Sequence, residues 1–449
     1  FQINTRALHK DIHKYSKEFG GIFTVFLPGP IVVLSDYDAL KEAYVHRTED
    51  FSGRAPIVLD SIKTLKNGGV LYANGESWKE NRRHSLMILR DFGMGKSVME
   101  EQVKQSIRDY LEYLDKIKDK SRVDLRWPIQ TMVSNIINET LFGFRYSFTD
   151  CQPLIDYVNT IYELVANMSS AVRFIIVYCP WIKYIPILGY RLVYKNKEYL
   201  DKIDNYIRES TERALVDFNK DDEPTCFVQA YCKIIGSSPN TTKDQLQAIC
   251  SDFFFAGQET TTTTLRWALL LLAANQDKQD RLREELSSVC GLSIPSMIDK
   301  QNLPYTSATI HEIQRLANIL MTSVLRQTLI DTEVMGHKIP KGTLINGDIH
   351  QILAHDPIFE RPEEFIPERY LNKDGKTLNK NIVDRTVPYS MGKRQCAGEA
   401  LARVELFMGV AATVQNYRIL PSSDGPIDLT PIAQIIMLPK SQNLRLEPI

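Results

Sequence analysis

Cys396 is the residue of this chain whose surroundings are best suited to binding a metal. It stands in residues 388–398, Pro-Tyr-Ser-Met-Gly-Lys-Arg-Gln-Cys-Ala-Gly, just before a predicted helix. Free backbone N–H groups at a helix start and the nearby cation Arg394 favour the thiolate, which is the metal-binding form of cysteine. Gly392 permits a tight turn, and Gly398 permits close approach of the helix start to a flat ligand. An isolated cysteine would instead be interpreted as buried and inert.

An acid and an alcohol stand side by side within a second predicted helix. Thr242 to Gln245 has the pattern of a capping box, and the helix is predicted to run to about Asn275. Residues 256–260, Ala-Gly-Gln-Glu-Thr, are followed by four more threonines. Glycine and β-branched residues are poor helix formers, so the stretch predicts a distortion where a hydroxyl or water enters the hydrogen-bond ladder. The alternative is a weakened helix with its threonines facing solvent.

Two further pairs have helical spacing. Glu312 and Arg315 lie three residues apart, and Trp78 and Arg82 lie four apart, so each pair shares one face of a predicted helix. Taken alone, Glu312 and Arg315 would be a surface ion pair of little energetic value.

The elements that must position these residues are mostly helical. Apolar periodicity predicts helices over most of 75–315, including a charged amphipathic helix near 278–286, and again after Cys396. We expect β-rich parts at about 20–70, at 324–350 and in the C-terminal tail, and irregular coil over 356–392. In the first part, 22–27 and 31–34 predict a hairpin, and Asp36 caps a short helix through Tyr44. No repeat or linker is visible, so we expect one mainly α domain, residues 1–449, with a smaller β region.

Bulk composition excludes some classes of protein. The 449 residues carry a net charge of -1, which argues against nucleic acid as the main partner. The seven cysteines include no Cys-x-x-Cys pair, so a zinc knuckle or a dithiol redox site is not expected. No uninterrupted apolar run reaches the roughly 20 residues of a spanning helix. Because the chain begins at Phe1, we expect its natural start, with any membrane anchor, to lie upstream.

Residues 388–398 resemble the haem-binding loop of the cytochrome P-450 family, Phe-x-x-Gly-x-Arg-x-Cys-x-Gly. Gly392, Arg394, Cys396 and Gly398 match, and Tyr389 replaces the usual Phe. The resemblance covers nearly the whole chain and points to the animal microsomal, family-2-like subgroup. It implies the cytochrome P-450 fold, a triangular helical body with the haem between a long distal helix and the proximal cysteine loop.

The resemblance implies a role for each motif. Cys396 would ligate the iron of haem b, and such thiolate ligation favours O–O cleavage, as is established for cytochromes P450. Ala256 and Gly257 would leave room for oxygen, Glu259 would relay protons from water, and Thr260 would hydrogen-bond the oxygen being activated. Arginine suits the haem propionates because its fork matches a carboxylate. The implied haem contacts are Trp78, Arg82, Ala256, Arg326, Tyr389, Gly392, Arg394 and Gly398.

A structural network is also implied. Arg369 lies in Pro-Glu-Arg-Tyr, residues 367–370, which resembles the family's Pro-Glu-Arg-Phe segment. With Glu312 and Arg315 it would form a buried charge network that supports the cysteine loop without taking part in catalysis.

The expected reaction inserts one oxygen atom from O2 into a small lipophilic substrate, by hydroxylation or epoxidation of a xenobiotic, fatty acid or steroid-like compound. NADPH would supply electrons through NADPH-cytochrome P-450 reductase, with cytochrome b5 as a further partner. Lys79, Arg83 and Lys393 would form the docking face, or simply a solvated basic surface. The implied location is the cytoplasmic face of the endoplasmic reticulum membrane. Residues 174–194 would touch the membrane surface or form a buried connection.

An apolar substrate pocket is expected from several separated segments. They are the loop after Pro56, residues 165–171, Phe254 and Phe255, residues 320–324 and residues 432–435.

Three other functions compete. A haem-thiolate isomerase or dehydratase would rearrange a bound peroxide without a reductase, and it would need no Glu259–Thr260 proton relay. A haem-based gas sensor or carrier would normally have an output domain, and no boundary for one is visible. A helical scaffold without haem would leave the motif around Cys396 unexplained.

Overall fold

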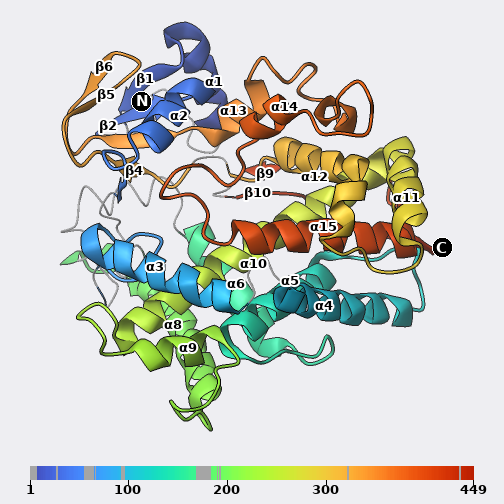
Figure 1. Ribbon diagram of the computed structural model, residues 1–449, viewed down its shortest axis with the longest axis horizontal. Coiled ribbons are helices and arrows are strands. Elements are labelled where there is room, and N and C mark those ends of the chain that lie inside the picture. The colour runs from blue at the N-terminus through green and yellow to red at the C-terminus, as the bar shows by residue number, and fades with distance from the viewer. Residues whose placement is uncertain are drawn as a thin grey trace.

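The computed structural model describes residues 8–26, 29–54, 65, 67–92, 97–167, 184–189, 191, 194–320, 323–433 and 436–449. Helices form most of the body (Figure 1). The longer ones are α1 (Leu8–Phe19), α3 (Gly75–Asp91), α4 (Ser97–Lys116), α5 (Arg126–Phe142), α6 (Gln152–Asn167), α8 (Lys195–Leu215), α10 (Lys243–Ala274), α11 (Gln276–Cys290), α12 (Pro304–Ala317) and α15 (Glu399–Asn416). The shorter ones are α2 (Tyr37–Lys41), η1 (Glu42–His46), α9 (Phe227–Ile234), η5 (Asp299–Asn302), α13 (Ile349–His355), η6 (Pro367–Tyr370) and α14 (Lys380–Arg385).

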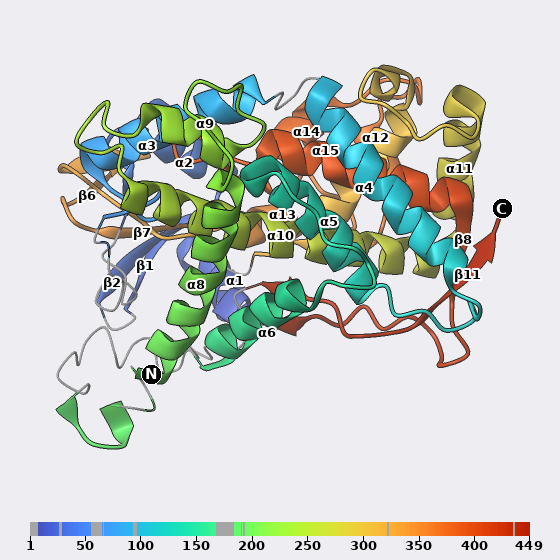
Figure 2. The ribbon, with the colours of Figure 1, turned by 90° about the horizontal axis from the view of Figure 1, so that it is seen from below.

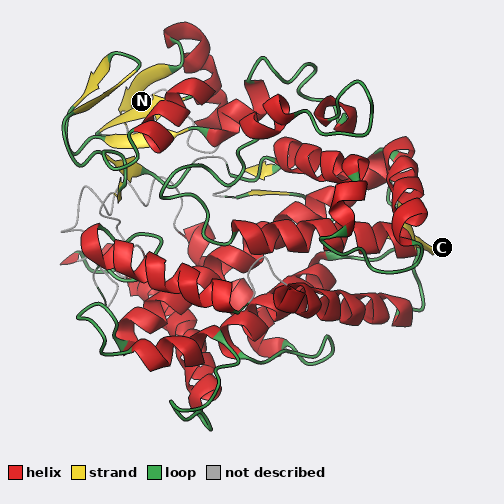
Figure 3. Ribbon diagram, viewed as in Figure 1, coloured by secondary structure: helices red, strands yellow, loops and turns green. Residues whose placement is uncertain are grey.

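The largest sheet lies at one corner of the molecule (Figure 3). Its strand order is β1-β2-β7-β4-β3, with β2 and β7 parallel and the other pairs antiparallel. The predicted hairpin is β1 and β2, and the mainly α fold with a smaller β region is confirmed. The strands are β1 (Ile22–Phe26), β2 (Pro30–Leu34), β3 (Gly53–Arg54), β4 (Arg326–Gln327), β5 (Thr332–Val334), β6 (His337–Ile339), β7 (Leu344–Gly347), β8 (Tyr417–Pro421), β9 (Ile432–Ala433), β10 (Met437–Leu438) and β11 (Leu444–Pro448).

The long helix α10 runs through the centre of the body (Figure 1). It begins where predicted, because the Thr242 hydroxyl accepts a hydrogen bond from the backbone N–H of Gln245 at 3.1 Å. Glycines permit close packing against its neighbours. A Cβ at Gly257 would lie 2.6 Å from Cδ1 of Ile137 in α5, and one at Gly409 in α15 would lie 3.2 Å from Leu265. Helices α5 and α15 therefore fix α10 from two sides.

The segment after β2 departs from the prediction in its last turn. Asp36 caps α2 by accepting hydrogen bonds from two backbone N–H groups, as expected. The α-helix ends at Lys41, however, and the chain continues as the π-helix η1 rather than ending at Tyr44. A single π turn adds one residue per turn and often marks a functional site. Here it brings the fully buried ring of Tyr44 against Gly347 of β7.

Four of the eight histidines meet where α1 packs on α13. His13 stacks on His355 with ring centroids 3.6 Å apart, and His9 meets His350 edge-on at 5.0 Å. His13 Nδ1 is also 3.0 Å from Oε1 of Gln351. Burial, followed by the field of the other histidines, lowers the pKa of His350 to about 3. Burial likewise lowers the pKa of His355, to about 4, so His350 and His355 are both neutral in the folded protein at neutral pH.

We predict that acidification loosens α1 from α13. An unfolded histidine takes up a proton near pH 6.5, whereas folded His350 resists it, so the stability that His350 contributes is present above about pH 6.5 and is lost as pH falls toward 3. Amide hydrogen exchange in α1, corrected for intrinsic rates, should accelerate between pH 7 and pH 5. His350→Gln should weaken this response, and His337→Gln on exposed β6 should not. Unchanged protection of α1 down to pH 4 would contradict the prediction.

Candidate active site

The cysteine loop is a tight turn placed directly before α15. The backbone N–H of Cys396 donates to the carbonyl of Tyr389 at 3.0 Å, and that of Gln395 donates to the carbonyl of Gly392 at 2.9 Å. Gly392 has φ +77°, and a Cβ there would overlap the carbonyl oxygen of Tyr44. A glycine is therefore required twice, for the backbone angle and for contact with η1. Gly398 caps the start of α15, with open space where its Cβ would be.

The surroundings of the Cys396 thiol differ from the expectation in one respect. Cys396 keeps some accessible surface. The protein atoms packed around its thiol nevertheless remove water from it, and this burial raises the pKa of the thiol above its ordinary value. The backbone N–H of Gly398 and the Arg82 guanidinium oppose that rise without overcoming it. The expected cation, Arg394, points elsewhere. A bound metal would favour the thiolate far more strongly than these groups do, because coordination deprotonates a thiol.

Four arginines, which we call the arginine cluster, converge beside this loop: Arg54, Arg82, Arg326 and Arg394. The backbone carbonyl oxygens that accept their hydrogen bonds come from several elements. Arg394 donates to the carbonyls of Ser52 and Ala73, Arg82 to Gln395, Arg326 to Met391, and Arg54 to Leu71, Val324 and Leu325. The cluster thus ties β3, α3 and β4 to the cysteine loop.

The arginine cluster has no acid to balance it in the part of the chain that the structure describes. Burial lowers the pKa of Arg394 to about 8 and that of Arg326 to about 10, and the neighbouring arginines of the cluster contribute to both shifts. Nη1 of both arginines and Nε1 of Trp78 are buried without a hydrogen-bond partner. The Trp78 ring lies 3.6 Å from the Arg394 guanidinium. A ligand with two carboxylates, such as haem with its propionates, would satisfy both the charge and the free donors.

Arg54 was missed by the sequence analysis. It is 6% exposed and pairs through β3 with Arg326 of β4, which places the two guanidinium groups in the same cluster. The only local signal was a basic residue after Gly53 in a β-rich stretch. Of the carbonyls that accept its hydrogen bonds, that of Leu71 lies 17 residues away, but those of Val324 and Leu325 lie 270 and 271 residues away.

On the distal helix α10, Ala256 and Thr260 of the predicted motif lie on a stretch that has accessible surface. The Thr260 hydroxyl donates to the carbonyl of Ala256 at 2.8 Å, and Phe255 and Ala256 are exposed in the middle of an otherwise buried helix. Two expectations are wrong. The Gly257 position faces Ile137 of α5, so its small size serves helix packing rather than space for oxygen. Phe254 is fully buried among aromatic rings, and it does not line a pocket.

Glu259 does not turn toward the Ala256 and Thr260 face. Its carboxylate accepts a hydrogen bond from the hydroxyl of Tyr162 in α6 at 2.5 Å and another from Thr263 at 3.2 Å. Glu259 is 8% exposed, and burial raises the pKa of its carboxyl. The sequence analysis did not single out Tyr162.

The structure brings Glu312, Arg315 and Arg369 into one buried network. Arg315 donates to both carboxylate oxygens of Glu312, at 2.7 and 3.0 Å, and Arg369 donates to Glu312 at 3.1 Å. The backbone N–H of Ile366 adds a fourth hydrogen bond to the same carboxylate. Both arginines also donate to backbone carbonyls in residues 353–364, so the network fixes the coil that precedes the cysteine loop.

Comparison with known proteins settles what this arrangement belongs to. Residues 1–446 match the family described as Cytochrome P450. The chain belongs to the cytochrome P450 family. It is 34% identical over 436 residues to cytochrome P450 2G1 of Oryctolagus cuniculus, covering 96% of this chain and 87% of the relative. It is 35% identical over 463 residues to cytochrome P450 2C23 of Rattus norvegicus, covering 100% and 90%.

As a cytochrome P450, the protein is a monooxygenase with haem b as its cofactor. It acts on small substrates, and its electrons originate from NADPH and arrive through a redox partner. These findings place the monooxygenase ahead of the sensor and scaffold alternatives.

Tyr389 is where this cytochrome P450 departs from the motif, and the structure shows the partner of the added hydroxyl. Nε2 of Gln314 in α12 donates to the Tyr389 hydroxyl at 2.8 Å, and the Arg403 guanidinium lies 5.0 Å from the ring. Gln314 directly precedes Arg315, so the cysteine loop and the buried network share one helix.

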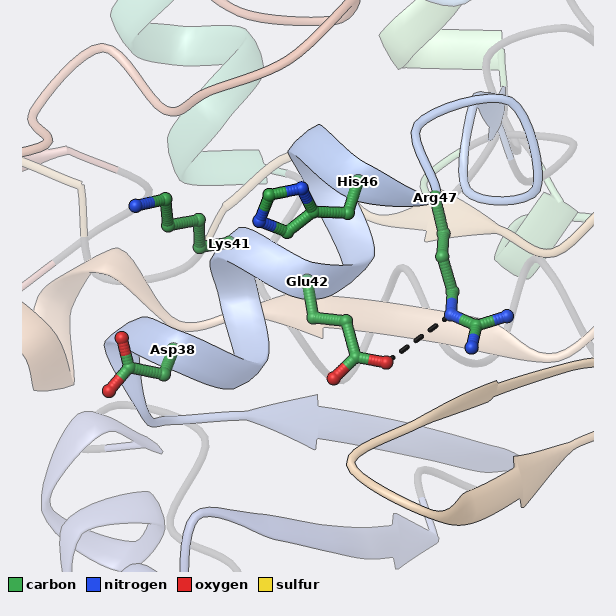
Figure 4. A pocket seen from close by; sticks show the side chains of 5 residues that line it. All are labelled: Asp38, Lys41, Glu42, His46 and Arg47. Atoms are coloured by element: carbon green, nitrogen blue, oxygen red, sulfur yellow. Dashed lines mark hydrogen bonds and ion pairs between the residues drawn. The ribbon is translucent and has the colours of Figure 1, made fainter.

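The open depressions on the outside of this cytochrome P450 do not coincide with the whole site. One of about 730 Å³ lies on α2 and η1 and is lined by charged side chains, with Glu42 paired to Arg47 (Figure 4). No predicted site residue lines it. A smaller one of about 290 Å³ includes Trp78 and Ser52, and so lies against the arginine cluster.

We predict that Glu312→Gln destabilises the protein by about 3–5 kcal/mol, because it leaves two buried guanidinium groups without their charge partner. The melting temperature and the fraction of the protein that holds haem should both fall. Glu112→Gln, which breaks the exposed Glu112–Lys116 pair, is the matched control and should change little. Equal melting temperatures for the two variants would show that the network carries no stability.

Proposed function

We propose that the Cys396 thiolate would bind the haem iron and that the arginine cluster, with Trp78, would hold the haem propionates. The single observation that carries this proposal is the excess of buried positive charge beside the cysteine loop. Three buried N–H donors point at no acceptor there, and no acid among the described residues balances the four guanidinium groups. Tyr389, Gly392 and Gly398 shape the loop around the sulfur, and Glu312, Arg315 and Arg369 support it.

The distal residues handle protons. Bound haem supplies oxygen activation, and its thiolate ligand favours O–O cleavage, as is general for cytochromes P450. Thr260, whose hydroxyl is bonded to the carbonyl of Ala256, holds a proton at the open face of α10. Glu259 is the adjacent acid, and burial keeps its pKa closer to neutrality, which suits proton transfer at physiological pH. Ala256 leaves the space next to this pair free of side chain.

A lipophilic substrate fits the apolar surface next to Thr260. Phe255 and Ala256 of α10 and Val324 before β4 are exposed. A small xenobiotic, fatty acid or steroid-like compound would be hydroxylated or epoxidised there. Parts of the expected pocket lie outside the described residues: most of the loop after Pro56, residues 168–171, 321–322 and 434–435.

The redox partner is proposed to be NADPH-cytochrome P-450 reductase, with cytochrome b5 as a second donor. Lys79 and Lys393 are exposed and flank the cysteine loop, although each pairs with an acid, Glu76 and Glu49 respectively. Acidic side chains of a flavoprotein would replace Glu76 and Glu49 as partners of the two lysines, since exposed ion pairs are weak.

The proposed location is the cytoplasmic face of the endoplasmic reticulum membrane. Among the described residues, no helix is both long and apolar enough to cross a bilayer. Large apolar side chains are exposed at Phe26 of β1 (62%), Tyr184 (76%) and Ile187 (78%). Residues 184–189 project on the side that also carries β1 and β2 (Figure 2). Such a surface suits contact with a membrane interface, but most of residues 174–194 lies outside the described part.

Cys396→Ser tests the iron ligand. The reduced, carbon-monoxide-bound wild type should show the strongly red-shifted Soret band of a thiolate ligand, and the serine variant should lose it. A histidine-like spectrum of the wild type, or a red-shifted band that survives Cys396→Ser, would refute the assignment. Oxygen use that depends on NADPH and reductase separates the monooxygenase from an isomerase.

Arg54→Gln tests the arginine cluster. Loss of one charge-assisted hydrogen bond, worth about 1.5–3 kcal/mol, should speed haem transfer to apomyoglobin by about tenfold or more. Arg47→Gln provides the control, because Arg47 is nearby in sequence but pairs with Glu42 and Glu333 on the surface. If both variants release haem at the wild-type rate, Arg54 does not hold a propionate.

A further inference from the structure

A tyrosine from α6 reaches the acid of the distal helix. The Tyr162 hydroxyl and Oε1 of Glu259 are 2.5 Å apart, and the two residues are 97 positions apart in the sequence. The hydrogen bond is charge-assisted when Glu259 is ionised, which makes it one of the stronger types in proteins. Glu259 is therefore fixed by a residue outside its own helix.

Groups from three helices surround the Glu259 carboxylate and affect its pKa. From α10, the Thr263 hydroxyl donates to the same oxygen, and Arg266 lies close enough to lower the pKa of the carboxyl. From the start of α5, Arg126 does the same more weakly and stacks on the Tyr162 ring at 4.8 Å. The acid therefore lies among groups of α5, α6 and α10, and the hydroxyl of Tyr162 is the strongest opposing influence on its pKa after burial.

Helix α6 reaches α10 through two tyrosines. Tyr157 packs on Phe254 with ring centroids 4.9 Å apart, and five residues later on both helices Tyr162 binds Glu259. The chemistry of the two contacts differs. The Tyr157 hydroxyl is buried and has no hydrogen-bond partner, so only its ring joins the helices. Tyr162 alone of these two couples α6 to an ionisable group.

We propose that Tyr162 is a positioning residue for Glu259, whose hydrogen bond holds the acid away from the Ala256–Thr260 face and makes proton delivery depend on the position of α6. The proposal rests on the proposed function of Glu259 as the proton-delivering acid. Tyr162 keeps its own proton, since it is the donor in the hydrogen bond.

The geometry explains why such a link would matter. Glu259 and Thr260 are adjacent in the helix, so their side chains leave it about 100° apart. With the carboxylate held by Tyr162, Thr260 hydrogen-bonds the backbone of Ala256 rather than Glu259. A small displacement of α6 would release the carboxylate, and one rotamer change would carry it toward Thr260. Helix α6 packs on α8, so movement of these two helices around a substrate would change the hydrogen bond between Tyr162 and Glu259.

Tyr162→Phe in the haem-loaded protein tests the contact without relying on turnover. The phenyl ring keeps the stack with Arg126, and only the hydroxyl is lost. Removing a donor to the ionised acid should raise the pKa of Glu259, so its protonated carboxyl band in infrared difference spectra should persist to a pH about one unit higher. Glu259→Gln identifies the band by removing it. Tyr157→Phe, which deletes a buried and unpartnered hydroxyl on the same helix, should leave the band unchanged.

The second measurement follows the electrons. The ratio of hydrogen peroxide formed to NADPH consumed is measured as a function of pH. In Tyr162→Phe, the pH at which this ratio reaches one half should move in the same direction as the infrared band. In Tyr157→Phe it should match the wild type. If Tyr162→Phe leaves both the band and the peroxide profile at wild-type positions while Glu259→Gln uncouples, the positioning role is overturned and the proposed function stands. If Glu259→Gln itself leaves coupling intact, the proposed role of Glu259 is wrong, and the dependence of proton delivery on α6 falls with it.

Discussion

Burial of the guanidinium groups of the arginine cluster, to which their mutual repulsion adds, is the constraint on which the rest of the site depends. Arg54, Arg326 and Arg394 are each at most 6% exposed, and no acid among the described residues offsets them. Burying charge without a partner is costly. The fold tolerates it because each guanidinium donates to backbone carbonyls that belong to other elements. An anionic ligand would offset the remaining cost, so its binding would stabilise the folded protein.

The two sides of the site achieve rigidity by opposite means. On the cysteine side, buried ion pairs provide the rigidity. Glu312 binds two arginines, and the remaining N–H groups of these arginines fix the coil that leads to the loop. On the distal side, α10 is fixed by packing, with Gly257 against α5 and Leu265 against Gly409 of α15. The ionisable group there, Glu259, is held by one hydroxyl from a third helix. The distal acid is thus the less constrained of the two.

Local patterns in the sequence predicted what local interactions determine. The turn at Gly392, the helix after Cys396, the cap at Thr242 and the helical faces of Trp78–Arg82 and Glu312–Arg315 all follow from residues within a few positions of one another. The π-helical turn did not follow, because its sequence also fits an α-helix. Side-chain direction was harder. Arg394, expected both beside the sulfur and as a haem contact, belongs to the arginine cluster and donates to the carbonyls of Ser52 and Ala73. Gly257 serves packing and Glu259 bonds to Tyr162, since each choice is made by a distant element. Arg54 and Gln314 could not have been selected for the same reason.

The pairing of β2 with β7 has a consequence for how the chain is made. Ile31 is opposite Leu344, a separation of 313 residues (344 minus 31). At roughly 5–20 residues per second, the ribosome needs about 15–60 seconds to deliver the second strand after the first. During that interval the hairpin of β1 and β2 has an open edge with unpaired backbone groups, which is the feature that promotes aggregation of nascent sheets. Arg54 of β3 precedes its partner Arg326 of β4 by 272 residues (326 minus 54), so the arginine cluster is assembled only after β4 has been made. Haem binding at the proposed site therefore has to wait until β4 has been made, and the hairpin of β1 and β2 has to be protected from aggregation until β7 has been made.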